Sequence, residues 1–97
     1  MNKESILKRL NEHRAEIIER FGLKTLALFG SAARDELQPD SDVDILVEFE
    51  GPMTFDGYMD LKFFLEDLLQ KNVDLVTNDG LRPRMRPIIE RDLIHVA

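Results

Sequence analysis

The sequence contains no cysteine and no tryptophan among its 97 residues. Without cysteine, the chain can form no disulfide and offers no thiolate to a metal ion. No apolar run approaches the ~20 residues that a membrane-spanning helix requires. The first 21 residues mix apolar and charged side chains at helical spacing, and they lack the apolar segment of a secretion signal. We therefore expect a cytoplasmic protein without membrane contact, whose fold depends on a hydrophobic core.

Basic charge is also scarce. The chain has 13 lysines and arginines against 19 aspartates and glutamates, which gives a formal net charge of −6. Proteins that bind long nucleic acids gather Lys and Arg to displace counterions from the phosphates. The densest basic cluster here is short, and we interpret Arg82, Arg84 and Arg86 as a solvated face. The composition therefore argues against a polynucleotide as the main ligand.

Apolar periodicity and turn residues divide the chain into helices and strands. Helices are expected at residues 6–21, which end at the capping glycine Gly22, at 55–70 and at 83–92, with one or two helical turns at 31–36. Strands are expected at residues 24–29, 42–49 and 73–77, with a short edge strand at 94–96. This order predicts an α/β (α+β) fold, in which residues 1–97 form a single domain with a small mixed sheet flanked by helices.

The predicted strand at residues 42–49 has an apolar face and an acidic face. Val43, Ile45 and Val47 share one side, whereas Asp42 and Asp44 lie on the other, about 6.6 Å apart along the strand. Two carboxylates side by side repel each other unless a cation separates them. Mg²⁺ suits such a site, because it takes one or two carboxylates together with substrate phosphates.

A third carboxylate and a glycine-serine turn accompany this pair. Asp74 lies between apolar neighbours, so we expect it on the same side as Asp42 and Asp44. Three carboxylates on adjacent strands could hold two ions about 3.5–4 Å apart, as in-line phosphoryl displacement requires. Gly30 and Ser31 follow an apolar strand, where a helix N-terminus would favour a phosphate. Arg34, one turn later, could add a charge-assisted contact.

Each of these features has an ordinary interpretation when it is taken alone, as turn, loop or edge-strand chemistry. Their combination resembles a known family. Gly30-Ser31, ten intervening residues and Asp42-Val43-Asp44 resemble the GS-x10-DxD signature of the nucleotidyltransferase superfamily typified by beta-type DNA polymerases. Arg34 and the run at residues 39–47 resemble its minimal nucleotidyltransferase (MNT) branch.

The resemblance implies a palm-like fold and an enzyme that transfers AMP from ATP to an acceptor, with release of pyrophosphate. It implies that Asp42, Asp44 and Asp74 bind Mg²⁺, as two ions, and that Gly30 and Ser31 hold the triphosphate. The family often has glycine after the arginine, whereas this chain has Asp35. A carboxylate there either weakens phosphate binding or points to solvent.

The chain has almost nothing beyond the expected catalytic sheet and its helices, so the acceptor must bring its own binding surface. Small MNT proteins resemble the antitoxins of toxin–antitoxin pairs whose partner is a HEPN-type RNase, and some adenylylate that toxin. We therefore expect a protein adenylyltransferase that neutralises a co-encoded HEPN toxin. Two alternatives stay open: a small-molecule, aminoglycoside-type adenylyltransferase subunit, and a non-catalytic antitoxin that acts by contact alone. A homo- or hetero-oligomer also stays open.

Overall fold

The computed structural model describes residues 2–97 and contains a four-stranded sheet in the order β3-β2-β1-β4. β1 pairs antiparallel with β2 and with β4, whereas β2 pairs parallel with β3. The expected mixed sheet, with its short edge strand, is therefore confirmed. The strands are β1 Leu23–Phe29, β2 Val43–Phe49, β3 Val73–Thr77 and β4 Ile94–His95.

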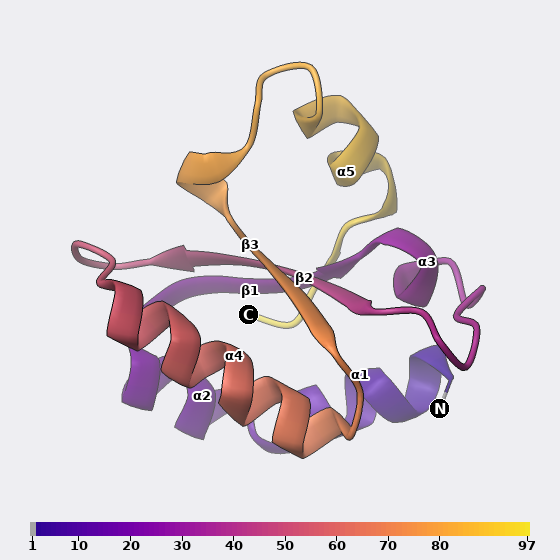
Figure 1. Cartoon of the computed structure of the whole chain (residues 1–97), viewed down its shortest axis with the longest axis horizontal. Coiled ribbons are helices and arrows are strands. Elements are labelled where there is room, and N and C mark those ends of the chain that lie inside the picture. Colours follow the sequence, from indigo (N-terminus) through magenta and orange to yellow (C-terminus); the bar gives the residue numbers. More distant parts are fainter. Residues whose placement is uncertain (1) are drawn as a thin grey trace.

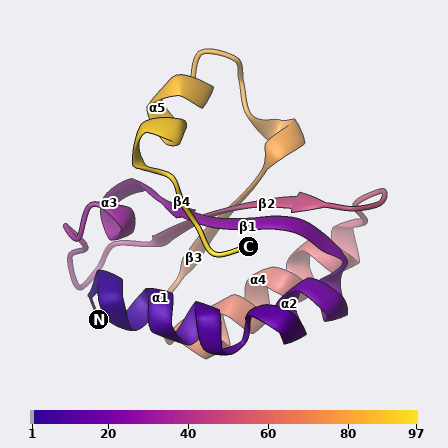
Figure 2. The same cartoon turned by 180° about the vertical axis from the view of Figure 1, so that it is seen from behind.

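The helices lie on both sides of this sheet. Three of them cover one face, and α5 stands on the opposite side together with the short 3-10 helix η1 (Figures 1 and 2). α3 is a single turn that begins where β1 ends. The three covering helices are α1 Lys3–Glu12, α2 Arg14–Phe21 and α4 Phe55–Leu69; the others are α3 Gly30–Ala33, η1 Asn78–Gly80 and α5 Arg86–Asp92.

The amino-terminal helix differs from the sequence prediction in its start, at Lys3 instead of residue 6, and in its continuity. A single helix was expected, but the structure divides it at His13, whose φ of −108° and ψ of 9° are not helical. Leu10, before the break, and Ile17, after it, are both completely buried, so each of the two helices packs against the core. Gly22 ends α2 in the left-handed conformation, with φ of 64°, as the sequence predicted.

The two faces of β2 have different surroundings. Val43, Ile45 and Val47 are completely buried in the main core, against the three covering helices. This confirms the apolar face that the alternation predicted. The opposite face has only a small apolar cluster, formed by Phe29, Leu46 and Ile89. One face of the sheet is therefore buried in the main core, and the opposite face is largely uncovered.

None of the helices within residues 2–97 combines the length and the apolar character that crossing a membrane requires.

Candidate active site

Gly30, Asp44 and Asp74 lie in one row across three neighbouring strands. Asp44 is the register partner of Asp74 on the parallel strand β3. On its other side Asp44 is opposite Phe29, the last residue of the antiparallel strand β1, and Gly30 follows directly. Strand pairing thus brings together residues that are 14 and 30 positions apart in the sequence.

Gly30 is required by the carboxylate beside it. Its φ is +70°, a conformation that side chains other than glycine rarely adopt. A Cβ atom at this position would overlap the carboxylate oxygen of Asp44. The glycine of the first motif and the second aspartate of the other motif are therefore packed against each other. This contact gives a physical reason for both residues to occur together.

Asp44 is the electrostatic centre of the row. Burial, followed by the neighbouring charges of Asp74 and Asp42, raises the pKa of its carboxyl from 3.8 to about 6. A hydrogen bond with the Asp74 carboxyl acts in the same sense, whereas the positive charge of Arg34 opposes it. Asp44 and Asp74 are consequently a coupled pair that a cation would stabilise in the ionised form.

The three predicted aspartates are not equally close. Asp42 is exposed and lies just before β2, and its influence on Asp44 is through its charge. Within residues 2–97, no three acidic or histidine side chains converge tightly enough to form a preassembled metal site. The Asp44–Asp74 pair nevertheless fits Mg²⁺, because this ion needs only one or two protein carboxylates and completes its shell with water and phosphate oxygens.

The glycine-serine turn lies on α3, and Arg34 follows it as the residue that caps the end of the helix. Gly30 begins this helix, and Ser31 is half-buried in its first turn. The guanidinium of Arg34 pairs with the carboxylate of Asp92 on α5 at 2.6 Å and with that of Glu36 at 3.4 Å. These hydrogen bonds, that of Asp92 first, raise the pKa of Arg34.

Asp92 was missed by the sequence analysis. It is 58 positions away from Arg34, and no local pattern distinguishes it from the other charged residues of its helix.

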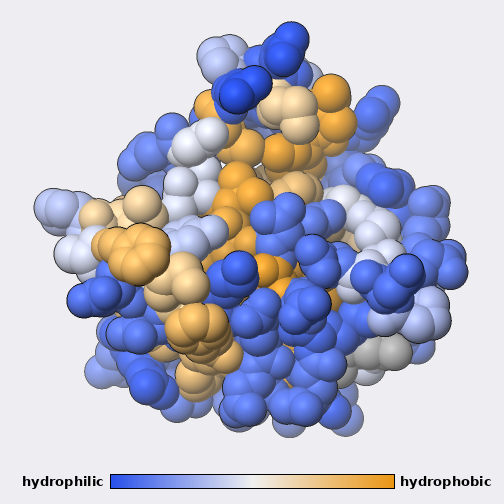
Figure 3. Space-filling model, viewed as in Figure 1, coloured by the Kyte–Doolittle hydropathy of each residue, from blue (hydrophilic) through white to orange (hydrophobic). Residues whose placement is uncertain are grey.

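A cleft of about 480 Å³ opens beside the row, between the sheet and α5. Its volume lies within the usual range for small-ligand sites. Its charged lining consists of Arg34, Asp74, Arg82 and Asp92, next to Gly30. Its apolar wall includes Met85 and Ile88, which are 42% and 51% exposed. Figure 3 shows apolar surface gathered between the sheet and the α5 region. The cleft therefore combines anionic, cationic and apolar surface next to the coupled carboxylates.

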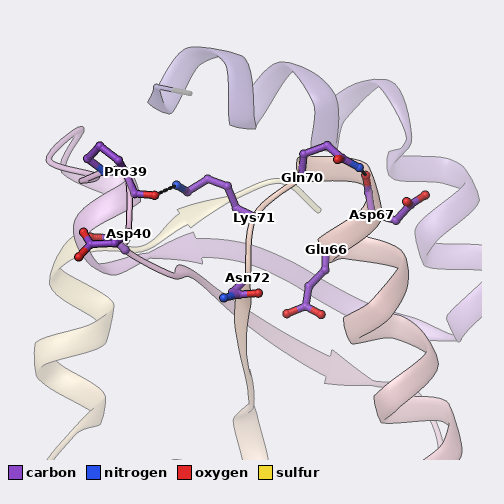
Figure 4. A pocket seen from close by; sticks show the side chains of 8 residues that line it. Pro39, Asp40, Glu66, Asp67, Gln70, Lys71 and Asn72 are labelled. Carbon is purple, nitrogen blue, oxygen red and sulfur yellow. Dashed lines mark hydrogen bonds between the residues drawn. The ribbon is translucent and has the colours of Figure 1, made fainter.

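A second hollow, of about 570 Å³, lies between the α4–β3 connection and the loop that precedes β2 (Figure 4). Several of its polar side chains, among them Lys71 and Glu66, already have partners within the fold. Lys71 donates a hydrogen bond to the Pro39 carbonyl at 3.0 Å, and Glu66 accepts one from the Val73 N–H at 2.9 Å. Lys71 thereby ties the α4–β3 turn to the loop that leads to Asp42. We interpret this hollow as a structural connection.

Asp35, the departure from the usual glycine, has a defined structural role. Its φ is +59°, which is the left-handed region that a glycine would occupy most easily. Its carboxylate accepts a hydrogen bond from the Lys3 N–H at 3.0 Å, in the first turn of α1. The side chain is exposed, and its carboxylate is directed toward the first turn of α1. An effect of Asp35 on phosphate binding stays a prediction.

Comparison with known proteins gives the family. Residues 10–96 match the Nucleotidyltransferase domain family. Protein adenylyltransferase MntA of Thermococcus cleftensis is 39% identical over 93 residues, which cover 96% of this chain and 94% of that protein. A protein of Methanocaldococcus jannaschii named putative protein adenylyltransferase MJ0126 is 38% identical over 88 residues, 90% of each chain.

Solved structures with the same fold are also known. One described as a putative minimal nucleotidyltransferase is 39% identical, with a TM-score of 0.83 over 97% of this chain and 95% of that chain. Another contains the tri-AMPylated HEPN toxin of Shewanella oneidensis in complex with an MNT antitoxin; it is 17% identical, with a TM-score of 0.69 over 94% of this chain and 71% of that one. The predicted MNT family and palm-like fold are confirmed.

The role of Asp35 predicts different effects for two substitutions. Asp35→Ala should lower the free energy of unfolding by about 1–2 kcal/mol, for two reasons. It removes the hydrogen-bond acceptor for the Lys3 N–H at the N-terminus of α1. It also places alanine, whose side chain can form no hydrogen bond, in the left-handed backbone region. Asp35→Asn keeps an acceptor and tolerates this backbone, so we expect a change below about 0.5 kcal/mol. Urea denaturation measures both. Equal stability of the alanine variant and the parent would refute the capping role.

The raised pKa of Asp44 predicts a pH-dependent stability in metal-free buffer. The folded state binds this proton more tightly than the unfolded state, so the stabilisation is complete below pH ~4 and is lost as the pH rises through about 6. Relative to Asp44→Asn, the parent should lose about 1–2 kcal/mol across this interval, after solvent screening.

Denaturation with EDTA at several pH values measures this difference, and Glu50→Gln, at an exposed loop position, controls for the loss of one negative charge. If Asp44→Asn is the less stable protein at pH 7, the carboxylate has a structural role and the electrostatic interpretation fails.

Proposed function

Because this chain belongs to the nucleotidyltransferase domain family, we propose that it transfers AMP from ATP to a hydroxyl group of a protein partner. The observation that carries this proposal is the row of Gly30, Asp44 and Asp74 beside an open cleft. A glycine that leaves space for a carboxylate, and a carboxylate pair that a cation would stabilise, are what a metal-bound triphosphate requires. A binding module that acted by contact alone would gain nothing from this repulsion.

The proposed role of each site residue follows from its position. The Gly30-Ser31 turn would hold the triphosphate, and Asp44 is packed against Gly30. Asp42, Asp44 and Asp74 would hold Mg²⁺. Asp74 lines the cleft and would act on the side of the acceptor. The bound ions would neutralise phosphate charge and acidify the attacking hydroxyl.

The transfer itself requires one bond exchange. The hydroxyl oxygen forms a bond to the α-phosphorus of ATP, and the bond between that phosphorus and the pyrophosphate breaks. The hydroxyl proton passes to the carboxylate of Asp74, which is exposed to the cleft. The protein contributes mainly orientation and electrostatic stabilisation, as is usual in phosphoryl transfer.

A protein acceptor is supported by three features. The curated relatives that match this chain nearly end to end are named protein adenylyltransferases. The net charge of −6 suits a protein better than a nucleic acid. The cleft is walled by exposed apolar side chains, Met85 and Ile88, which a protein segment carrying a hydroxyl could cover. We propose that the acceptor is a co-encoded HEPN-type toxin, with this chain as its antitoxin, as in the structurally similar complex of an MNT antitoxin with an AMPylated HEPN toxin.

Intact-mass spectrometry tests this function. The purified chain, the co-encoded protein, ATP and Mg²⁺ should give the partner with one or more added AMP groups. EDTA should abolish the modification, because the carboxylates repel a triphosphate when no metal is present. Asp44→Asn should also abolish it, whereas Glu50→Gln should not. A partner that is neutralised without a mass change would contradict the proposal and favour inhibition by contact; modification of an aminoglycoside instead would identify a small-molecule enzyme.

A further inference from the structure

The ion pair between Arg34 and Asp92 connects the phosphate end of the cleft to α5. The Nη1 atom of Arg34 donates to the Asp92 carboxylate at 2.6 Å, and its Nε atom donates to Glu36 at 3.4 Å. Asp92 is the better fixed partner, since its side chain is 18% exposed, compared with 64% for Glu36. The helix that carries Asp92 is anchored by the buried Ile89. Asp92 is therefore a rigid support for a long side chain.

The pairing leaves part of the guanidinium available. An arginine carries five N–H donors in a planar fork. Among residues 2–97, Nη1 and Nε of Arg34 have hydrogen-bond partners, and no partner is found for Nη2. Arg34 lines the same cleft as Gly30 and Asp74. Its positive charge acts to lower the pKa of Asp44. A guanidinium held at one edge can present its other edge to an anion in this cleft.

We propose that Asp92 is a positioning residue, which holds the Arg34 guanidinium toward the triphosphate and thereby sets the affinity for nucleotide. The inference rests on the proposed nucleotide-binding function of the cleft and assigns to α5 a part in it. Without Asp92, the long, half-exposed side chain of Arg34 would lose conformational entropy each time a nucleotide bound, and this loss would weaken binding. With Asp92, that ordering is complete before binding.

The geometry also defines the opposite possibility. A carboxylate at 2.6 Å from the guanidinium could compete with phosphate oxygens for it, in which case removal of Asp92 would strengthen nucleotide binding. Removal of any acidic residue near the cleft would have a small effect in the same direction, because it reduces repulsion of the triphosphate. The sign of the effect, relative to a control with the same charge change, therefore decides between positioning and competition.

Glu90 provides this control. It lies on the same helix as Asp92, its side chain is 55% exposed, and it pairs with Arg86 at the longer distance of 3.8 Å. Asp92→Asn and Glu90→Gln each remove one negative charge from α5. Only Asp92→Asn removes a contact with Arg34.

Calorimetric titration with a non-hydrolysable ATP analogue and Mg²⁺ tests the proposal. Asp92→Asn should bind about tenfold more weakly than Glu90→Gln, as expected for loss of a charge-assisted contact. Arg34→Lys, which keeps the charge but not the planar fork, should show a similar loss. In an Arg34→Ala background, Asp92→Asn should have no further effect. Asp92→Glu should restore most of the affinity.

The outcomes separate the two proposals. If the parent protein does not bind the analogue with Mg²⁺, the nucleotide function fails and the role of Asp92 fails with it. If the parent binds and Asp92→Asn binds as tightly as Glu90→Gln or more tightly, the nucleotide function stands and the positioning role is overturned.

NMR of the arginine side chains in the parent protein provides a second measurement that needs no variant to fold. A guanidinium held by Asp92 should show slowed rotation and resolved Nη signals for Arg34, which shift when the analogue binds. Signals averaged by free rotation would contradict the proposal.

Discussion

Two carboxyl groups that repel each other lie side by side because their strands pair in one particular register. Asp44 and Asp74 are partners on parallel strands, and burial together with this proximity raises the pKa of Asp44 to about 6. Such an arrangement lowers stability unless a cation occupies it. Gly30 completes the constraint, because only a residue without a side chain leaves room for the Asp44 carboxylate. The candidate site is thus a consequence of sheet register and of one missing Cβ atom.

The remainder of the fold compensates for this local cost. Three helices pack on one face of the sheet and bury the apolar side of β2, so that most of the core lies away from the acids. The opposite face is covered only in part, by α5 and its small cluster around Ile89. This asymmetry produces a cleft beside the carboxylates. It also allows one side chain of α5, that of Asp92, to reach Arg34, which follows α3.

Much of this arrangement could be predicted from the sequence, because the signals were local. The alternation of β2 identified its two faces, and the apolar neighbours of Asp74 placed it on the acidic face. The spacing of Gly30-Ser31 and Asp42-Val43-Asp44 identified the family. Three findings depended on tertiary contacts and carried no local signal. They are the break at His13, the Asp35 contact with α1, and the Arg34–Asp92 pair between distant segments.

The central claim is that sheet register assembles a phosphoryl-transfer site in which the carboxylates have different roles. Asp74→Asn tests it most directly, because the amide keeps the shape of the side chain and removes its charge on the acceptor side. Mg-ATP affinity and the single-turnover rate of AMP transfer are measured for this variant and for the parent. The account predicts a rate lower by about 10²–10³, with affinity changed only slightly, as for loss of a contact made mainly in the transition state. Transfer at nearly the parental rate would contradict it.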